Sequence, residues 1–204
     1  MQDSILEKAV HLFMRYGVKS VSMDDLAREL GISKKTLYQY FDTKEALLQR
    51  TLEYNQSCEL GEIQKIKARV DNALQEIVEI ARMVVAQLQQ MSPSLIFDLK
   101  KYHPEAWKTF EEMQLTHVYS IIKENLERGI AQGLYRNDFD LEIMARFYLS
   151  SFHTLLDEKI FPPLEFPRGK VFQEFIRHYL RGIVSPMGLR YLEKLFATTS
   201  LTTQ

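Results

Sequence analysis

ELGISKKTLYQYFDTKEALL, residues 29–48, holds three lysines, two tyrosines and one glycine, and its apolar residues recur every three or four positions. That spacing is typical of helices with one buried face. Gly31 permits the positive φ that ends one helix, and Ser33 is a suitable N-cap for the next, which begins at Lys34. Two short helices joined by a glycine-containing turn form a helix-turn-helix, predicted here at about residues 22–41.

The residues before this stretch complete a predicted three-helix domain. Gly17 can end the first helix as a C-cap residue, and Ser22 followed by Asp25 makes the capping pattern of the second helix. The apolar face of the first helix consists of Ile5, Leu6, Ala9, Val10 and Phe13. The buried stripe of the second helix consists of Met23, Leu26, Ala27 and Leu30.

The helix after Gly31 has two different faces when its side chains are placed at about 100° per residue. Leu37 and Phe41 point toward the first two helices. The side chains that project away are Lys35, Thr36, Gln39 and Tyr40, with Lys34 and Tyr38 on the flank. Lysine, threonine and glutamine can reach base edges in a major groove, and tyrosine hydroxyls donate to phosphate oxygens. The alternative is a solvated charged face, but a preceding helix, glycine turn and N-cap favour DNA binding.

The charge of the chain is focused rather than spread. The net charge is −1 over 204 residues, which argues against a protein that coats nucleic acid by bulk electrostatics. From Gly31 to Lys44, however, three basic residues face one acidic residue. We therefore expect contact with phosphate to come from this local patch.

Composition and motifs bound the remaining function classes. The single cysteine, Cys58, excludes an internal disulfide, and the five histidines have no spacing that suggests a zinc site, so neither metal nor cofactor is predicted. No apolar run could cross a bilayer and no signal peptide is recognised, so we expect a cytoplasmic protein without membrane contact. The chain lacks G-x-S-x-G, H-E-x-x-H and Walker motifs, which argues against an enzyme. A helix-turn-helix scaffold for protein contacts is the other alternative.

The segment from Ile5 to Leu48 resembles the DNA-binding domain of the TetR family of bacterial transcriptional regulators. The resemblance is carried by A-x-x-L-F-x-x-x-G at residues 9–17, by S-M-D-D-L-A-x-x-L-G-I-S at 22–33 and by K-K-T-L-Y-Q-Y-F-D-T-K-E-A-L at 34–47. It covers the first quarter of the chain. It implies an all-helical homodimer that binds a palindromic double-stranded operator and releases it when a small molecule enters the carboxy-terminal domain.

The resemblance also assigns roles to individual residues. Ser22 would hold phosphate, and Tyr38, Tyr40 and Lys44 would bind the DNA backbone. The complete predicted DNA-binding set is Ser22, Ser33, Lys34, Lys35, Thr36, Tyr38, Gln39, Tyr40 and Lys44. Many members have glycine or another small residue where Lys35 stands, so a second lysine here suggests an additional phosphate or guanine contact.

Beyond the resemblance, helix signals dominate and the predicted fold class is all-α. We expect a helix-turn-helix domain at residues 1–55 and a larger helical ligand-binding and dimerisation domain at 56–204. The further predicted helices cover about 43–57, 70–91, 104–132, 141–156 and 171–183, with a helix start at Ser92 and Pro93 and a turn between Gly129 and Gly133.

The helices at 141–156 and 171–183 have apolar stripes too wide for one buried face. Each is therefore predicted to pack on its own domain and on a partner subunit, which agrees with the dimer interface that the resemblance implies. The interface residues singled out are Phe152, Phe175 and Tyr179. A deep-core helix of a single chain is the alternative.

The middle helices carry aromatic, flexible and hydrogen-bonding side chains of the kind that line a pocket for an apolar or amphipathic ligand. The predicted pocket residues are Met83, Gln87, Met91, Phe97, Tyr102, Trp107, Phe110, Met113, His117 and Tyr148. The resemblance implies a repressor released by a ligand, and the roughly 150 residues outside the DNA-binding domain agree with a sensor domain of that kind. The alternative is a second domain that only dimerises.

Overall fold

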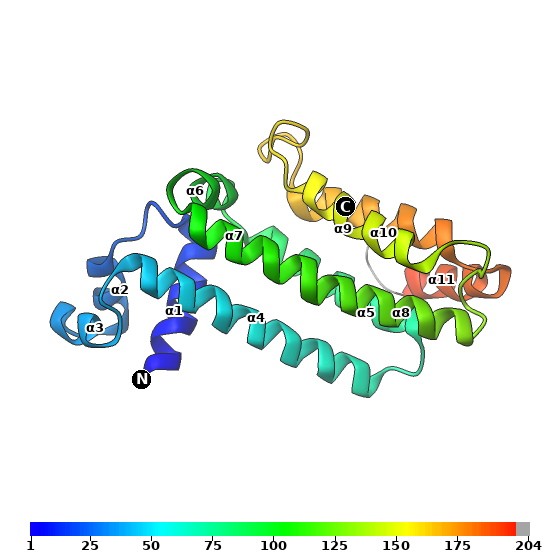
Figure 1. Ribbon diagram of the computed structural model, residues 1–204, viewed down its shortest axis with the longest axis horizontal. Coiled ribbons are helices and arrows are strands. Elements are labelled where there is room, and N and C mark those ends of the chain that lie inside the picture. The colour runs from blue at the N-terminus through cyan, green and yellow to red at the C-terminus, as the bar shows by residue number, and fades with distance from the viewer. Residues whose placement is uncertain (199–204) are drawn as a thin grey trace. The chain divides into compact units, whose positions relative to one another are not determined.

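A computed structural model describes residues 1–198, which form helices joined by turns (Figure 1). Within these residues the only extended pairing is an isolated antiparallel bridge between Tyr135 and Val184. The predicted all-α fold class is confirmed. No helix in residues 1–198 combines the length and the apolar composition needed to cross a lipid bilayer.

The chain divides into two compact units. Unit 1 contains Met1–Glu62 and Gln90–Met113, and unit 2 contains Ile63–Gln89 and the residues from Gln114 onward. The predicted boundary after residue 55 lies inside a helix, so the units are not identical with the two predicted domains. The functional division at residue 55 stays a prediction.

Unit 1 holds the helix-turn-helix. Its helices are α1 (Gln2–Tyr16), α2 (Met23–Leu30), α3 (Lys34–Tyr40), the first part of α4 (Lys44–Arg69), α6 (Leu95–Tyr102) and α7 (Pro104–Met113). The first three helices lie where the sequence predicted them. The predicted end of α4 at about residue 57 is wrong, because the helix continues to Arg69 through Gly61, which is exposed and has open space around it.

The core of unit 1 joins α6 to the amino-terminal helices. Ile5 and Leu26 are fully buried, and Leu99 of α6 packs into the same cluster. The Ser92 amide donates to the Met14 carbonyl at 2.6 Å, and the Lys19 amide donates to the Asp98 carboxylate at 3.0 Å. The loop between α1 and α2 is therefore fixed to α6.

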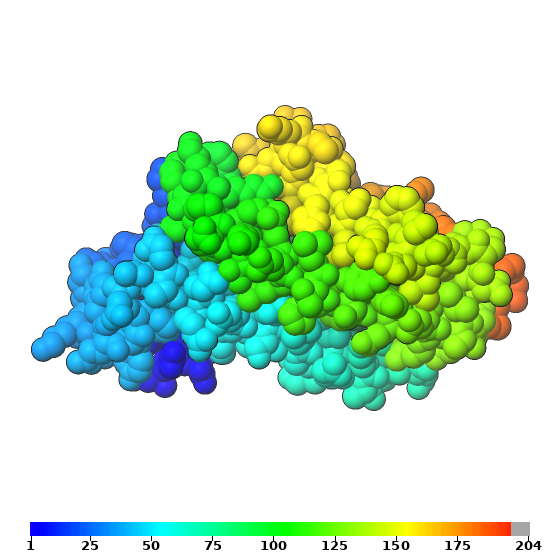
Figure 2. Space-filling model, viewed as in Figure 1, coloured from blue at the N-terminus to red at the C-terminus, as the bar shows by residue number. Residues whose placement is uncertain are grey.

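Helix α7 runs along the first half of α4, as the green and cyan atoms in Figure 2 show. Gln49 of α4 donates to the Thr109 hydroxyl at 2.6 Å. Ser92 was predicted to cap α6, but the N-cap is Ser94 and no side chain caps this helix. The serine hydroxyls bond to each other instead, at 3.1 Å.

Unit 2 is built from longer helices. They are α5 (Ala73–Gln90), a π-helical turn η1 (Gln114–Val118), α8 (Tyr119–Ala131), α9 (Leu141–Leu155), α10 (Arg168–Ile183) and α11 (Pro186–Thr198). The prediction of one regular helix over 104–132 is wrong, because η1 interrupts it between α7 and α8. Helix α11 was not predicted.

A buried polar network links α5 to α8 in unit 2. Glu76 is only 1% exposed, and its carboxylate forms an ion pair with Arg128 and accepts from the Asn125 amide at 3.1 Å. The Tyr135 hydroxyl donates to the Asn125 side-chain oxygen at 2.9 Å. The Tyr135 ring lies against Gly129, where a Cβ would approach it to 2.1 Å. The end of α8 and the residues that follow it, up to Tyr135, are thus held by close packing.

Candidate nucleic-acid interface

The second helix starts with a complete capping box. The Asp25 amide donates to the Ser22 hydroxyl oxygen at 3.1 Å, and the Ser22 amide donates to the Asp25 carboxylate at 3.0 Å. Bonding to Ser22 lowers the pKa of Asp25 below its ordinary value. The Ser22 hydroxyl is therefore already engaged by the helix that it begins.

A tight turn sets the angle between α2 and α3. Gly31 has φ of 65°, in the left-handed region, and its amide and that of Ile32 bond back to α2 carbonyls. Ser33 then caps α3 by accepting from the Thr36 amide at 3.0 Å. These are the roles that the sequence predicted for Gly31 and Ser33.

The two faces of α3 are as different as the sequence predicted. Leu37 is fully buried in the core of unit 1, with Phe41 directly after the helix. The side chains exposed on the other face are Lys34, Lys35, Tyr38, Gln39 and Tyr40, and Thr36 is partly exposed. The structure thus brings six of the predicted DNA-binding residues together on one solvent-facing surface.

The lysines of α3 have different surroundings. Lys34 forms an ion pair with Asp24 of α2 at 2.7 Å, and this partner raises the pKa of Lys34. Within the part of the chain that the structure describes, Lys35 has no ion-pair partner. Lys35 is therefore the more available cation for a phosphate or a guanine.

Lys44, which was predicted to bind the DNA backbone, makes a hydrogen bond within unit 1. Its ammonium group donates to the Val18 carbonyl at 2.5 Å and is half-buried, and burial lowers the pKa of Lys44. This bond ties the start of α4 to the loop between α1 and α2. The side chain is committed to the fold of unit 1.

Comparison with known proteins identifies the amino-terminal domain. Residues 5–51 match the family described as bacterial regulatory proteins, tetR family. The amino-terminal domain of this chain belongs to the TetR family of transcriptional regulators. The uncharacterised HTH-type transcriptional regulator YvaF of Bacillus subtilis is 26% identical over 190 residues, covering 91% of this chain and 96% of YvaF. YvaF is thus named as a transcriptional regulator.

Solved structures of other regulators share the fold of this TetR-family chain. A transcriptional regulator from Cytophaga hutchinsonii has a TM-score of 0.68 at 20% identity, over 89% of this chain and 97% of its own. The Thermus thermophilus FadR repressor, solved in complex with lauroyl-CoA, has a TM-score of 0.57 at 18% identity, over 89% and 94% of the two chains.

The predicted pocket residues of the regulator fall in both units. Met91 and Trp107 pack against the buried core of unit 1, and Phe97 and Tyr102 are exposed on α6. Phe110 and Met113 are partly buried on α7. In unit 2, Met83, Gln87 and His117 are partly buried and Tyr148 is buried. Their shared role as a ligand pocket stays a prediction.

The predicted interface residues form an aromatic cluster inside unit 2 of the regulator. The Tyr148 ring lies 5.3 Å from Phe175 and 5.1 Å from Tyr179, and Phe152 packs edge-on against Phe172. Tyr179 is buried within its own chain. The large apolar side chains most exposed on α9 are instead Ile143 and Phe147, at 52% and 59%.

Sequence reasoning missed the partners of two lysines in this regulator. Asp24 bonds to Lys34 across the turn, and the Val18 carbonyl holds Lys44 from 26 positions away. It also missed Thr43, whose hydroxyl accepts from the Ala46 amide at 3.0 Å and caps α4. The signal available in the sequence was a threonine, a favoured N-cap residue, directly before the first residue of the helix.

Proposed function

We propose that this regulator is a homodimeric repressor that binds a palindromic operator through α3 and releases it when a small molecule binds the helical region after residue 55. The observation that carries the DNA-binding part is α3 itself. Its buried side is anchored by Leu37 and Phe41, while a row of donors and acceptors faces solvent. A helix held in this way can enter a major groove without losing its packing.

The side chains of α3 divide the work of recognition. The Thr36 hydroxyl and the Gln39 amide can donate and accept hydrogen bonds at base edges. Tyr38 and Tyr40 are about two-fifths exposed, and their hydroxyls suit phosphate oxygens. Lys35 adds a free cation to this surface, and Lys34 must exchange Asp24 for DNA. Lys44, held by Val18, positions the fold rather than binding the backbone.

The two serines of the predicted DNA-binding set keep a secondary role in this proposal. Ser22 and Ser33 both use their hydroxyl oxygens as N-caps. Removing either hydroxyl would loosen the start of α2 or α3 as well as any phosphate contact. They hold the reading helices in position.

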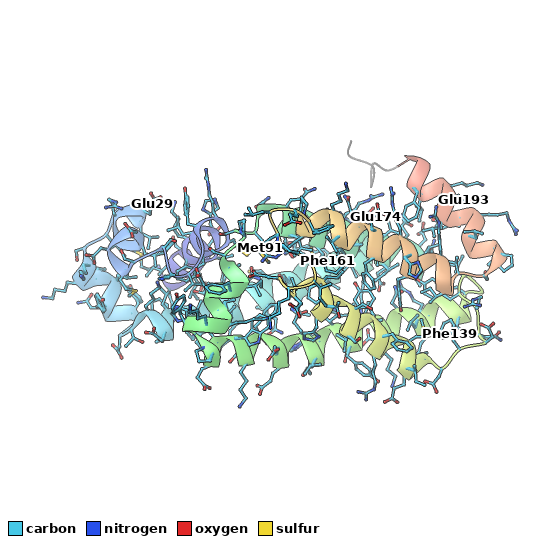
Figure 3. All side chains as sticks on the ribbon, turned by 90° about the horizontal axis from the view of Figure 1, so that it is seen from above. Glu29, Met91, Phe139, Phe161, Glu174 and Glu193 are labelled. Carbon is cyan, nitrogen blue, oxygen red and sulfur yellow. The ribbon has the colours of Figure 1, made fainter. Side chains whose placement is uncertain are left out.

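Exposed apolar side chains on α9 support dimerisation. Ile143 and Phe147 lie one helical turn apart on an exposed face, and Ser150 follows on that face. The outer face of α10 is polar, as Glu174 illustrates in Figure 3. A partner subunit that covers α9 would remove apolar surface from water and present a second α3 to a second half-site.

Release by a ligand is supported by the fold that this chain shares with the lauroyl-CoA complex of Thermus FadR. The predicted lining residues Met83, Gln87, His117 and Tyr148 lie in unit 2. A ligand needs a differential affinity of ~1–3 kcal/mol between the two states to change operator occupancy by about 5- to 150-fold.

The test begins with an operator selected from random-sequence duplexes by the full-length protein. We expect an enriched palindrome, bound less selectively by Gln39→Ala. Acyl and other apolar compounds that raise the melting temperature of the protein should then lower its operator affinity. If no sequence is enriched, the DNA-binding proposal fails. If stabilising compounds leave operator affinity unchanged, the domain only dimerises.

A further inference from the structure

A second group of cations lies in unit 1, outside the helix-turn-helix. It is formed by Lys19, in the loop between α1 and α2, and by Phe97, Lys101 and Tyr102 of α6. We call these four residues the α6 patch. Phe97 and Tyr102 are 44% and 40% exposed, which is high for aromatic side chains without a partner protein.

The α6 patch is organised by contacts between its own members. The Lys19 ammonium donates to the Tyr102 hydroxyl at 3.1 Å and lies 4.5 Å from the centre of the ring. The Lys101 ammonium lies 5.0 Å from the Phe97 ring centre and 5.4 Å from that of Tyr102. The two rings meet edge to face at 6.2 Å. Both ammonium groups therefore lie within cation–π distance of the Tyr102 ring.

Both cations are free to bind an anion. Neither Lys19 nor Lys101 has an ion pair with a carboxylate in residues 1–198. The nearby Asp98 side chain is 3% exposed and is occupied by the Lys19 amide. The positive surroundings also lower the pKa of the Tyr102 phenol, chiefly through the hydrogen bond from Lys19. An anion that approaches this surface therefore meets positive charge and hydrogen-bond donors.

The helix-turn-helix, by contrast, has no surplus of positive charge. Between Ser22 and Lys44, four basic residues are matched by four acidic residues. Lys34 and Arg28 are paired with Asp24 and Asp25, respectively. Since affinity for duplex DNA comes largely from neutralised phosphates, α3 alone offers few cations for an operator.

We propose that the α6 patch is a second contact with the operator, in which Lys19 and Lys101 neutralise backbone phosphates next to those at the start of α2. The proposal rests on the operator binding proposed above. Lys19 lies three residues before Ser22, so their Cα atoms are within about 11 Å. Duplex DNA carries one charge per ~1.7 Å of helix axis, so phosphates close to Ser22 are within reach of Lys19.

The bond between the Lys19 amide and Asp98 makes the contact rigid, because it fixes this loop to α6. The α6 patch and the start of α2 therefore move together. When DNA binds at one of them, no further conformational entropy is lost to bring the other into position. The contact carries no base readout. It raises affinity for every sequence and increases its salt dependence.

The experiment compares full-length variants on the selected operator between 50 and 200 mM salt. In the double variant Lys19→Ala/Lys101→Ala, the backbone amide that bonds to Asp98 is retained. Two lost phosphate contacts should reduce the slope of log affinity against log salt by about 1.8. Affinity should fall without a change in sequence preference. The arginine variant Lys19→Arg/Lys101→Arg should keep the wild-type slope.

The matched control is Lys100→Ala/Lys108→Ala, which removes the same charge from α6 and α7. Lys100 lies on the Trp107 ring, on the α7 side, and Lys108 is 69% exposed. We expect this control to keep the wild-type slope. A wild-type slope in the Lys19/Lys101 variant overturns the α6 contact, and an equal loss in the control overturns it too. If the wild-type protein binds no operator, the proposed function fails first.

Discussion

Lys34 and Lys44 differ in what they can offer to DNA, although the sequence predicted a DNA contact for both. Lys34 is exposed and can exchange Asp24 for a phosphate. Lys44 is half-buried and donates to the Val18 carbonyl, so releasing it would leave that carbonyl with only the longer hydrogen bond from the Val21 amide, at 3.4 Å. At the scale of single residues, exposure and existing hydrogen bonds decide which polar groups remain available.

Tyr40 belongs to the available group, and its hydroxyl is proposed to donate to a backbone phosphate. Tyr40→Phe should weaken operator binding about tenfold, which corresponds to ~1.4 kcal/mol. The order of preferred sequences should stay the same, because the phosphate is not sequence-specific. Fluorescence anisotropy at fixed low salt, with several duplex sequences, measures the operator affinity and the order of preferred sequences. Tyr16→Phe, at an exposed ring of α1, is the control, and undiminished affinity in Tyr40→Phe would remove the phosphate role.

His103 makes the stability of unit 1 depend on pH. Burial and then the Lys44 ammonium lower the pKa of His103, and Glu45 and Asp98 oppose them only in part. The unfolded chain therefore binds a proton more readily than the folded chain just below pH 6.5, the ordinary pKa of histidine. The contribution of the neutral His103 side chain to the free energy of unfolding is complete above pH 6.5. It is lost as the pH falls through the lower pKa that His103 has in the folded protein.

We expect the urea midpoint of the wild-type protein to decrease between pH 7.5 and 5.5. His103→Gln should show a smaller decrease, because the neutral side chain has no proton to gain. His11→Gln, at an exposed position of α1, serves as the control. Parallel pH profiles for His103→Gln and the wild-type protein would show that His103 does not cause the pH dependence of stability.

At the scale of elements, short-range patterns predicted the fold well where the cause is local. The capping box at Ser22, the left-handed Gly31 and the cap at Ser33 each depend on residues a few positions apart. The end of α4 and the π-helical turn η1 depend on packing and register, for which the sequence carries no comparable signal. The partner of Lys44 also escaped prediction, because 26 positions separate it from Val18.

Close packing makes the substitution of Gly129, in unit 2, costly. Gly129→Ala would place a Cβ 2.1 Å from the Tyr135 ring, and the hydroxyl of that ring is held by Asn125. We expect a loss of about 1–3 kcal/mol in the free energy of unfolding. Gly61→Ala, at an exposed position of α4 with open space, should be neutral or stabilising because alanine favours helix.

Urea denaturation of both variants, with helicity followed by circular dichroism, tests this difference. The expected order of stability places Gly61→Ala at or above the wild-type protein and Gly129→Ala well below it. Equal midpoints for the two variants would mean that the Tyr135 ring can move aside at little cost.

At the scale of the whole molecule, the proposed function requires two subunits. Phe147 is the most exposed large apolar residue of α9. Phe147→Asp would place a charge in the proposed interface, and truncation of a central aromatic residue alone costs ~2 kcal/mol or more in many interfaces. We therefore expect the variant to be monomeric by light scattering at micromolar concentration, where the wild-type protein should be dimeric.

The control for this change is Leu164→Asp, in the segment between α9 and α10, where the side chain is 87% exposed. Leu164 is three residues after Phe161, which Figure 3 labels. It introduces the same charge outside the proposed interface and should leave the mass unchanged. A wild-type protein that is monomeric at this concentration would contradict dimerisation through α9.

The most direct test of operator binding by a dimer is hydroxyl-radical footprinting of the full-length protein on its selected operator. Two α3 helices related by two-fold symmetry should protect two half-sites, with centres about 10 base pairs apart or at a multiple of that spacing. Phe147→Asp should lose this paired protection at the same protein concentration. Protection of a single half-site by the wild-type protein, or protection without symmetry, would contradict the account.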